Sequence, residues 1–159
     1  MIAPLQLIDY TAETVSYERL DADPAPDDMD LGVGLGFGID ARADEERNAQ
    51  CVILSVRFNQ NDDEIPDDLK PCMAHRGHVR VQGWIRWISE EMAERDDAPE
   101  LLLTNGLAML YGIARVHIAH LTDGRNADRL LVPSISFQPI VDDWMKHEDE
   151  ELVDGQNKV

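Results

Sequence analysis

The chain has 159 residues, of which 43% are hydrophobic, and this composition suits one globular domain with a buried core. It carries 32 acidic and 14 basic residues, so its net charge of −18 argues against binding nucleic acid through phosphate contacts. The apolar runs are shorter than a membrane span, and two cysteines are too few for a disulfide scaffold. No signal peptide is visible, so we expect a cytoplasmic protein without membrane insertion.

Four strands are predicted in the first half of the chain. The first covers residues 4–20, where the alternation of apolar side chains changes phase and predicts a bulge. The others cover residues 31–42, 49–59 and 77–88, each with apolar side chains at alternate positions. Four strands without an intervening helix predict an antiparallel meander.

The second predicted strand has an unusual pattern, because Leu31 to Ile39 alternates apolar residues with four glycines. Side chains alternate across a strand, so one face is apolar and the other is bare. The spacing matches neither phosphate-binding glycine motif, and the acidic residues that follow, beginning with Asp40, would repel a polyphosphate. One explanation of the glycine face is that a ligand or another backbone approaches it closely. The alternative is that the glycines only permit the strand to twist or a neighbour to pack tightly.

Two helices are predicted in the second half. Residues 99–122 are apolar on nearly all sides, so this helix should be buried on nearly all sides. One small sheet cannot cover both of its faces, so we infer that a second subunit covers one of them. Residues 138–152 predict a shorter amphipathic helix that ends a single domain over 1–152, and residues 153–159 are expected to form a disordered tail. The residues assigned to the subunit interface are Leu107, Leu110, Tyr111, Ala114 and Ile118.

Two histidine motifs have spacings that occur in metal sites. Cys72, His75 and His78 form a C-x-x-H-x-x-H set, and His117 and His120 lie one helical turn apart. Each motif lacks the further ligands that zinc requires, so we expect no metal and no other cofactor. Neither cysteine and no serine has a sequence cue for an activating base, so we do not expect an enzyme.

The order of four antiparallel strands, one long buried helix and a short C-terminal helix resembles SecB, the bacterial protein-export chaperone. Three stretches carry the resemblance, which spans most of the chain. Gln6 to Glu18 resembles the family's first strand, most closely in Val15-Ser-Tyr-Glu18. Met109-Leu-Tyr-Gly-Ile-Ala-Arg115 resembles the signature segment of the long helix. Val132-Pro-Ser-Ile-Ser-Phe137 resembles the proline-containing segment that leads into the last helix.

The resemblance implies an α+β fold assembled as a homotetramer, a dimer of dimers in which two eight-stranded sheets enclose the long helices. It also implies an ATP-independent holdase that keeps preproteins unfolded for export through the Sec pathway. SecB-like chaperones that protect an antitoxin in toxin–antitoxin systems are the alternative. Clients would lie in an apolar groove. The groove residues that the resemblance implies are Leu31, Val33, Leu35, Phe37, Phe137, Ile140, Trp144 and Met145.

The export members of the family also dock the SecA motor through acidic residues on the outer face of the sheet. Glu18 matches one such position, whereas Thr14 stands where relatives often carry an acid. The fourth strand carries Arg80 and Arg86 instead of an acidic patch. These departures leave the holdase interpretation intact and weaken the expectation that SecA is a partner.

Two functions of other classes remain open from the sequence. An acyl-thioester hydrolase fold also wraps a sheet around a long apolar helix, but such folds usually place that helix early in the chain. An acidic mimic of nucleic acid would use the net charge of −18 to block a basic protein. Turnover of acyl-CoA would favour the first function, and co-purification with a DNA-binding protein would favour the second.

Overall fold

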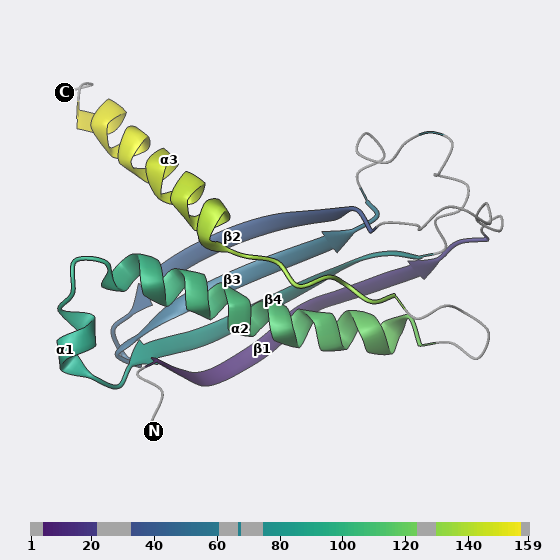
Figure 1. Ribbon diagram of the computed structural model, residues 1–159, viewed down its shortest axis with the longest axis horizontal. Coiled ribbons are helices and arrows are strands. Elements are labelled where there is room, and N and C mark those ends of the chain that lie inside the picture. Colours follow the sequence, from purple (N-terminus) through teal and green to yellow (C-terminus); the bar gives the residue numbers. More distant parts are fainter. Residues whose placement is uncertain (1–4, 22–32, 61–66, 68–74, 124–129, 157–159) are drawn as a thin grey trace.

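The computed structural model describes residues 5–21, 33–60, 67, 75–123 and 130–156. A long helix lies across one face of an antiparallel sheet, and a C-terminal helix leaves from one edge of this layer pair (Figure 1). The predicted α+β fold class is confirmed, with the strands first, then the long helix, then the C-terminal helix. The elements are β1 (Leu5–Arg19), β2 (Leu35–Asp44), β3 (Ala49–Phe58), β4 (His75–Trp87), α1 (Glu90–Ala93), α2 (Ala98–Leu121) and α3 (Gln138–Gln156).

The strands are ordered β1–β4–β3–β2, and all neighbours are antiparallel. The predicted four-strand meander holds for β2, β3 and β4 but is wrong for β1, which joins the sheet beside β4 instead of beside β2. Residues 20–34 connect β1 to β2, and this is enough chain to pass the two intervening strands. The predicted bulge in the first strand is confirmed, because the register of β1 shifts between Leu7 and Asp9 and again between Ala12 and Thr14.

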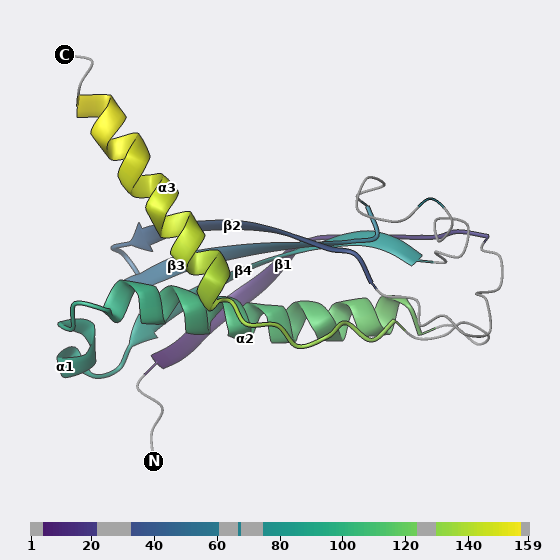
Figure 2. The ribbon, with the colours of Figure 1, turned by 45° about the horizontal axis from the view of Figure 1, so that its top comes forward.

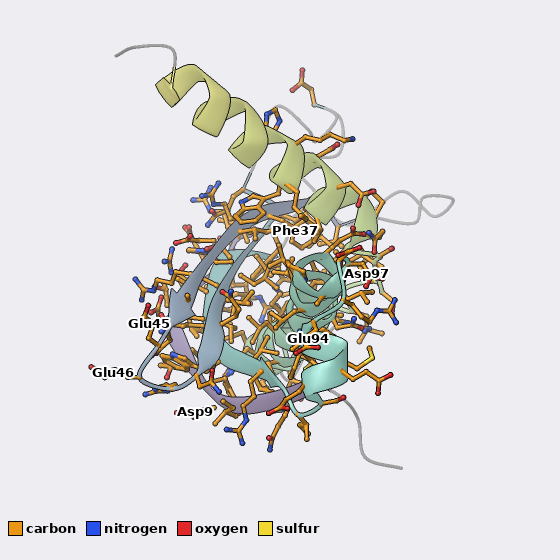
Figure 3. The ribbon with its side chains drawn as sticks, turned by 90° about the vertical axis from the view of Figure 1, so that its left-hand side faces the viewer. Asp9, Phe37, Glu45, Glu46, Glu94 and Asp97 are labelled. Atoms are coloured by element: carbon orange, nitrogen blue, oxygen red, sulfur yellow. The ribbon has the colours of Figure 1, made fainter. Side chains whose placement is uncertain are left out.

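Helix α2 packs closely on the sheet because glycines stand at two contact points. A Cβ atom at Gly83 of β4 would lie 2.6 Å from Leu110, and one at Gly106 of α2 would collide with Ile85. A larger residue at either position would push the helix away from the strands. Figure 3 views the two layers end-on, with side chains filling the space between α2 and the strands. The fully buried side chains of this core include Leu54, Val56, Val81, Leu107 and Ile118.

The ladder of β2 begins at Leu35, whereas the sequence predicted a start at residue 31. The cause is Asn59, whose left-handed backbone (φ 52°) ends the pairing of β3 with β2. The Gly34 amide donates to Asn59 Oδ1 (2.9 Å), and the Asn59 amide donates to the Gly34 carbonyl (2.8 Å). The Asn59 side chain also donates to the His75 carbonyl at the start of β4 (2.8 Å). One residue thus ties together the ends of three strands.

Three other boundaries differ from the prediction. β4 begins at His75, two residues before the predicted start. α1 was not predicted because Glu-Glu-Met-Ala forms a single turn, which is too short to show helical periodicity. α3 continues to Gln156, so residues 153–156 are helical and not part of a disordered tail. No proline interrupts this stretch, so the helix propagates past the predicted end at residue 152.

Helix α3 projects away from the sheet, and only its first turns touch the rest of the fold (Figure 2). Val141 is fully buried and Trp144 is partly buried, so the contact is apolar. Gln138 fixes the start of the helix to α2, because its side chain hydrogen-bonds to Glu100 and to Thr104. The position of α3 is therefore set at its base.

Helix α2 buries one side against its own sheet and exposes another apolar side. The five residues assigned to a subunit interface are at most 4% exposed within one chain, so they have no surface left for a second chain. On the opposite side Val116 is 55% exposed, and Ala108 and Gly112 are exposed as well. A Cβ atom at Gly112 would meet nothing within 4 Å. A second subunit could cover only this opposite side. The five residues are Leu107, Leu110, Tyr111, Ala114 and Ile118.

Among the described residues, α2 is the one helix long and apolar enough to cross a membrane by length and composition. Ten of its residues are buried within the fold, and the contacts described above place it against β3 and β4. This is the pattern of a core helix in a soluble protein.

Candidate functional site

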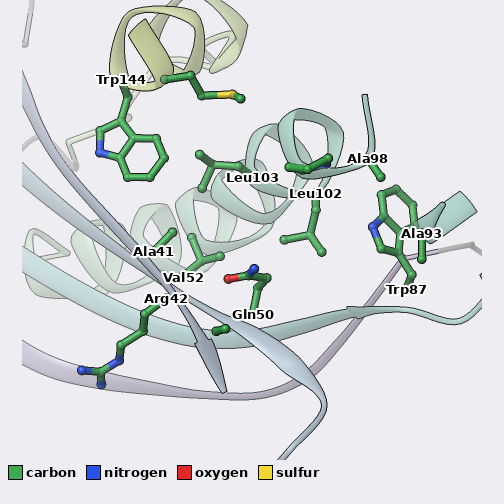
Figure 4. A pocket seen from close by; sticks show the side chains of 13 residues that line it. Ala41, Arg42, Gln50, Val52, Trp87, Ala93, Ala98, Leu102, Leu103 and Trp144 are labelled. Atoms are coloured by element: carbon green, nitrogen blue, oxygen red, sulfur yellow. The ribbon is translucent and has the colours of Figure 1, made fainter. Parts of the chain in front are cut away.

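A cavity of about 480 Å³ opens where β2, β3 and β4 meet the three helices (Figure 4). Trp144 of α3 stands on one side of it and Trp87 of β4 on the other. Leu102 and Leu103 of α2 and Val52 of β3 lie between the two indole rings. The remaining lining residues are Ala41, Arg42, Ala43, Gln50, Ala93, Ala98, Pro99 and Met145.

The cavity exists because small side chains stand where larger ones would fill the core. Ala41 and Ala43 of β2, Ala93 of α1 and Ala98 of α2 contribute only methyl groups to the lining. Figure 4 shows the Arg42 guanidinium directed away from the space. A cavity of this size with these walls takes up apolar side chains, and most of its binding energy would come from burial of apolar surface.

Three aromatic rings join β2, α2 and the segment that precedes α3. Phe37, Tyr111 and Phe137 pack edge to face in each pair, with ring centroids 5.5–5.8 Å apart. The Tyr111 hydroxyl donates to the Pro133 carbonyl (2.8 Å), which holds the segment before α3 against α2. Burial raises the pKa of Tyr111, although nearby Arg115 acts in the opposite direction, so this donor keeps its proton.

The eight predicted groove residues occupy different places in the structure. Trp144 and Met145 line the cavity. Phe37 and Phe137 belong to the aromatic trio, and Phe137 is only 2% exposed, so it supports the site from within the core. Leu31 lies outside the described residues. Contact of these side chains with a client stays a prediction. The other three are partly buried and pack against the same core: Val33, Leu35 and Ile140.

Sequence reasoning missed most of the cavity wall. Ala41 and Ala43 stand on the inner side of β2, and Ala43 lies one residue beyond the predicted end of that strand. The small size of these two residues was the signal that could have indicated the cavity. Trp87 shares the inner face of its strand with Ile85, but only the fold shows that the helices leave it partly uncovered. The contribution of Leu102 could not be read from a helix that is apolar on nearly all sides.

The outer face of the sheet holds paired charges at the position predicted for a docking partner. Glu18 lies opposite Arg76, whose guanidinium contacts its carboxylate at 2.7 and 2.8 Å. Thr14 lies opposite Arg80, and Arg80 pairs with Glu13 at 2.7 Å. These carboxylates already have cationic partners, so the docking role of Glu18 stays a prediction.

The histidine motifs do not converge on a metal site within the described ranges. His75 and His78 are three residues apart on β4, so their side chains point to opposite faces of the sheet. His75 is buried on the inner face, where Nδ1 is hydrogen-bonded to the Tyr17 hydroxyl (2.9 Å). Cys72 lies outside the described residues. In the part of the chain that the structure describes, no three His, Cys, Asp or Glu side chains are grouped to hold an ion.

This arrangement, a four-stranded antiparallel sheet followed by a long helix and a C-terminal helix, is the SecB-like fold. The chain is similar to a solved Mycobacterium tuberculosis structure, the SecB-like chaperone Rv1957 in complex with a ChAD peptide from the Rv1956 HigA1 antitoxin. The two share 18% sequence identity with a TM-score of 0.58, over 84% of this chain and 91% of that chain. No protein-family profile and no curated protein matches the chain. The resemblance to SecB-like chaperones is therefore confirmed in the fold.

Proposed function

We propose that this protein is an ATP-independent holdase chaperone that binds unfolded polypeptide segments in the cavity beside α3. The observation that carries the proposal is an open apolar cavity between two tryptophans, Trp87 and Trp144, in a SecB-like fold. Its wall offers few polar groups that would select one ligand by hydrogen bonds. Such a site suits clients of varied sequence.

Binding at this cavity would be weak for a single client side chain. Burying one leucine-sized side chain contributes about 1.5–3 kcal/mol. A chain held at several such cavities in one assembly would bind far more tightly, because each later contact forms at high effective concentration. An unfolded client exposes many apolar side chains and a folded one exposes few, so this arrangement favours unfolded chains.

Filling the cavity tests the proposal. Ala41 lies opposite buried Val52 on the inner face of β2, so Ala41→Phe places a ring in the cavity. We expect the wild type to suppress aggregation of an unfolded client without nucleotide, and the variant to bind that client about tenfold more weakly. Thr11→Phe on the outer face of β1 is the matched control and should bind as the wild type does. A wild type without holdase activity, or an unchanged Ala41→Phe, would contradict the proposal.

We also propose that the chain assembles as a homotetramer, a dimer of dimers. β1 is a fifteen-residue edge strand, and pairing with a second β1 would give an eight-stranded sheet. On its inner face Tyr10 and Val15 are 48% and 42% exposed, which leaves apolar surface next to the exposed side of α2. Exposed apolar surface of this kind is commonly covered by a partner.

Light scattering tests the assembly. We expect a mass about four times the 17.9 kDa of one chain. Val116→Glu on the exposed side of α2 should lower this mass, because it would bury a carboxylate between helices. Leu131→Glu, which changes a side chain that is 75% exposed outside α2, is the control. A stable monomer would contradict the tetramer.

Preproteins for Sec export and an antitoxin are two separate proposals for the client. Both proposals place the chaperone and its client in the cytoplasm. The similar Rv1957 structure contains an antitoxin peptide, and the paired carboxylates of the outer face do not favour SecA as a partner. Mass spectrometry of polypeptides bound in the cell separates the classes. Bound secretory precursors would indicate a role in export, and a single bound antitoxin would indicate a role in a toxin–antitoxin system. If Ala41→Phe captured the same polypeptides in the same amounts as the wild type, both proposals would be contradicted.

A further inference from the structure

On the outer face of the sheet the two central strands, β3 and β4, are basic, although the protein is strongly acidic and the edge strands carry acidic side chains on the same face: Asp9, Glu13, Glu18, Asp40 and Asp44. β3 and β4 together contain no aspartate or glutamate, in a chain with 32 acidic and 14 basic residues. Their arginines alternate with core residues and so point away from α2. The four arginines are Arg57, Arg76, Arg80 and Arg86.

Two of these arginines have no carboxylate partner among the described residues. Arg76 and Arg80 pair with glutamates of β1, each at 2.7 Å. Arg86 donates only to the neutral side-chain oxygen of Gln6, at 3.4 Å. Arg57 forms no ion pair with any residue that the structure describes. Of the four arginines on β3 and β4, two are therefore paired with glutamates of β1, and two have no direct carboxylate partner within the described ranges.

The pairing register places Arg57 and Arg80 at neighbouring outward-facing positions of β3 and β4. Arg57 lies opposite His78, and the next outward-facing pair is Ser55 opposite Arg80. The two guanidinium groups thus start from diagonal positions on adjacent strands, with their Cβ atoms about 7 Å apart. An anion placed over Ser55 and His78 would lie between them. This geometry defines a basic patch of Arg57, His78 and Arg80.

The glycines of β2 leave the surface beside this basic patch bare. Gly36 lies opposite Arg57, and Gly38 lies opposite Ser55. A Cβ atom at Gly36 would lie 3.9 Å from the Arg57 Cβ, an ordinary contact, and no described glycine has a positive φ. Neither packing nor backbone geometry therefore requires glycine at position 36. The missing side chain does leave room for another backbone to approach the sheet closely.

His78 contributes an unpaired polar atom to this surface. Its Nε2 atom is buried and has no hydrogen-bond partner. Buried polar atoms in native proteins nearly always pair with protein, water or a ligand, so Nε2 offers a hydrogen-bond position to a bound group. Burial lowers the pKa of His78, and Arg57 and Arg80 lower it further. The ring is therefore neutral at pH 7 and can donate or accept one hydrogen bond.

We propose that the basic patch docks an acidic segment of a partner polypeptide, which lies extended over Gly36 and Gly38 and places a carboxylate between Arg57 and Arg80. Charge-assisted hydrogen bonds to two guanidinium groups would hold that carboxylate. The bare strand would let the backbone of the segment approach the sheet closely. The basic patch and the client cavity lie on opposite faces of the sheet, so a client and this partner can bind at the same time.

A protein segment fits this surface better than a nucleic acid does. The basic patch supplies only a few cationic groups, whereas nucleic acids bind by neutralising many phosphates at once. The net charge of −18 would also repel a long polyanion. A short acidic peptide presents few charges and meets less of this repulsion.

Fluorescence anisotropy with a labelled peptide of alternating glutamate and serine, at low salt, tests the proposal on the full chain. Arg57→Gln should weaken binding about tenfold, the effect of losing one charge-assisted pair. Lys146→Gln removes an exposed positive charge from α3 and is the matched control, which should bind as the wild type does. Glu13→Gln should strengthen binding, because it releases Arg80 from its ion pair.

Two further variants locate the bound peptide, and a second ligand tests its chemical class. Gly36→Thr should weaken binding while circular dichroism shows an intact fold, and Ala41→Phe should leave peptide binding unchanged. Equal binding by Arg57→Gln and the wild type would overturn the proposal. Loss of peptide binding in Ala41→Phe would show that the peptide binds in the client cavity and not at the basic patch. If single-stranded DNA bound as tightly as the peptide, the partner would be a nucleic acid and not a protein.

Discussion

The two faces of this sheet are built from the same four strands, yet different forces stabilise them. On the inner face Val52, Leu54 and Val81 are fully buried beneath α2. On the outer face Trp84 donates to Asp44 (2.8 Å) and Arg47 stacks on its ring (4.0 Å), while ion pairs join β4 to β1. The inner face therefore owes its stability to burial, whereas the outer face combines charge contacts in water with two buried apolar side chains, Cys51 and Ile53. Substitutions on the two faces should differ accordingly.

The largest loss of stability is expected at the aromatic trio on the inner side. Phe137 is 2% exposed and touches Phe37 and Tyr111, so Phe137→Ala leaves a cavity and should cost about 3–5 kcal/mol. Urea unfolding measures this difference. Leu131→Ala is the control, because its side chain is 75% exposed and its loss should cost under about 0.5 kcal/mol. Similar losses for the two variants would mean that the trio does not anchor the segment before α3.

A smaller loss of stability is expected from substitution of Asn59, which joins the ends of three strands. Asn59→Ala removes the acceptor for the Gly34 amide and the donor to the His75 carbonyl, and it places alanine at a positive φ. These changes together should cost about 2–3 kcal/mol in chemical denaturation. Asn59→Asp keeps the acceptor and loses the donor, so its stability should lie between those of alanine and the wild type. A neutral Asn59→Ala would show that the strand ends are held by other contacts.

The outer face should tolerate the loss of an ion pair. Glu18→Gln removes the partner of Arg76, and the two side chains are 55% and 43% exposed. Exposed pairs of this kind contribute about 0–1 kcal/mol, so the free energy of unfolding should fall by less than about 1 kcal/mol. High salt should reduce the difference further. A loss as large as that of Phe137→Ala would contradict the contrast between the two faces.

The fold could be predicted from the sequence where local patterns decide the structure. Alternation in residues 49–59 and 77–88 indicated strands, and the apolar periodicity of residues 99–122 indicated the long helix. The pattern did not indicate which side of that helix faces its own sheet, because both sides are apolar. The contact at Gly106 and Gly83 decides this orientation, and it depends on residues from two elements meeting in space.

The candidate site could be predicted only in part, for a similar reason. Trp144 and Met145 were assigned to an apolar groove through the resemblance to SecB, and both line the cavity. The space itself arises from alanines on β2, α1 and α2 that are far apart in the sequence. The basic patch likewise depends on register, because Arg57 meets His78 and Arg80 only once β3 and β4 are paired.

The smallest effect expected is a change in the titration of His78, and it tests whether Arg57 and Arg80 act on this ring as the geometry of the basic patch indicates. Arg57 of β3 lies opposite this ring, Arg76 and Arg80 flank it on β4, and Ser16 of β1 lies on its other side. Burial, Arg57 and Arg80 lower its pKa below the ordinary 6.5, so the unfolded chain takes up the proton first as the pH falls. His78 therefore lowers the stability of the fold as the pH falls through 6.5, and this effect is lost well above that pH.

Arg57→Gln should raise the pKa of His78, because one of the repelling charges is removed while the burial of the ring remains. NMR titration of the ring protons measures this shift, and Lys146→Gln on α3 should leave it unchanged. In the wild type the acidic peptide should also raise the pKa of His78, because its bound carboxylate neutralises the charge of Arg57. In Arg57→Gln that charge is already absent, so the peptide should raise the pKa less. A pKa that responds to neither change would mean that burial alone sets it. Arg57, His78 and Arg80 would then be separate groups and not one basic patch.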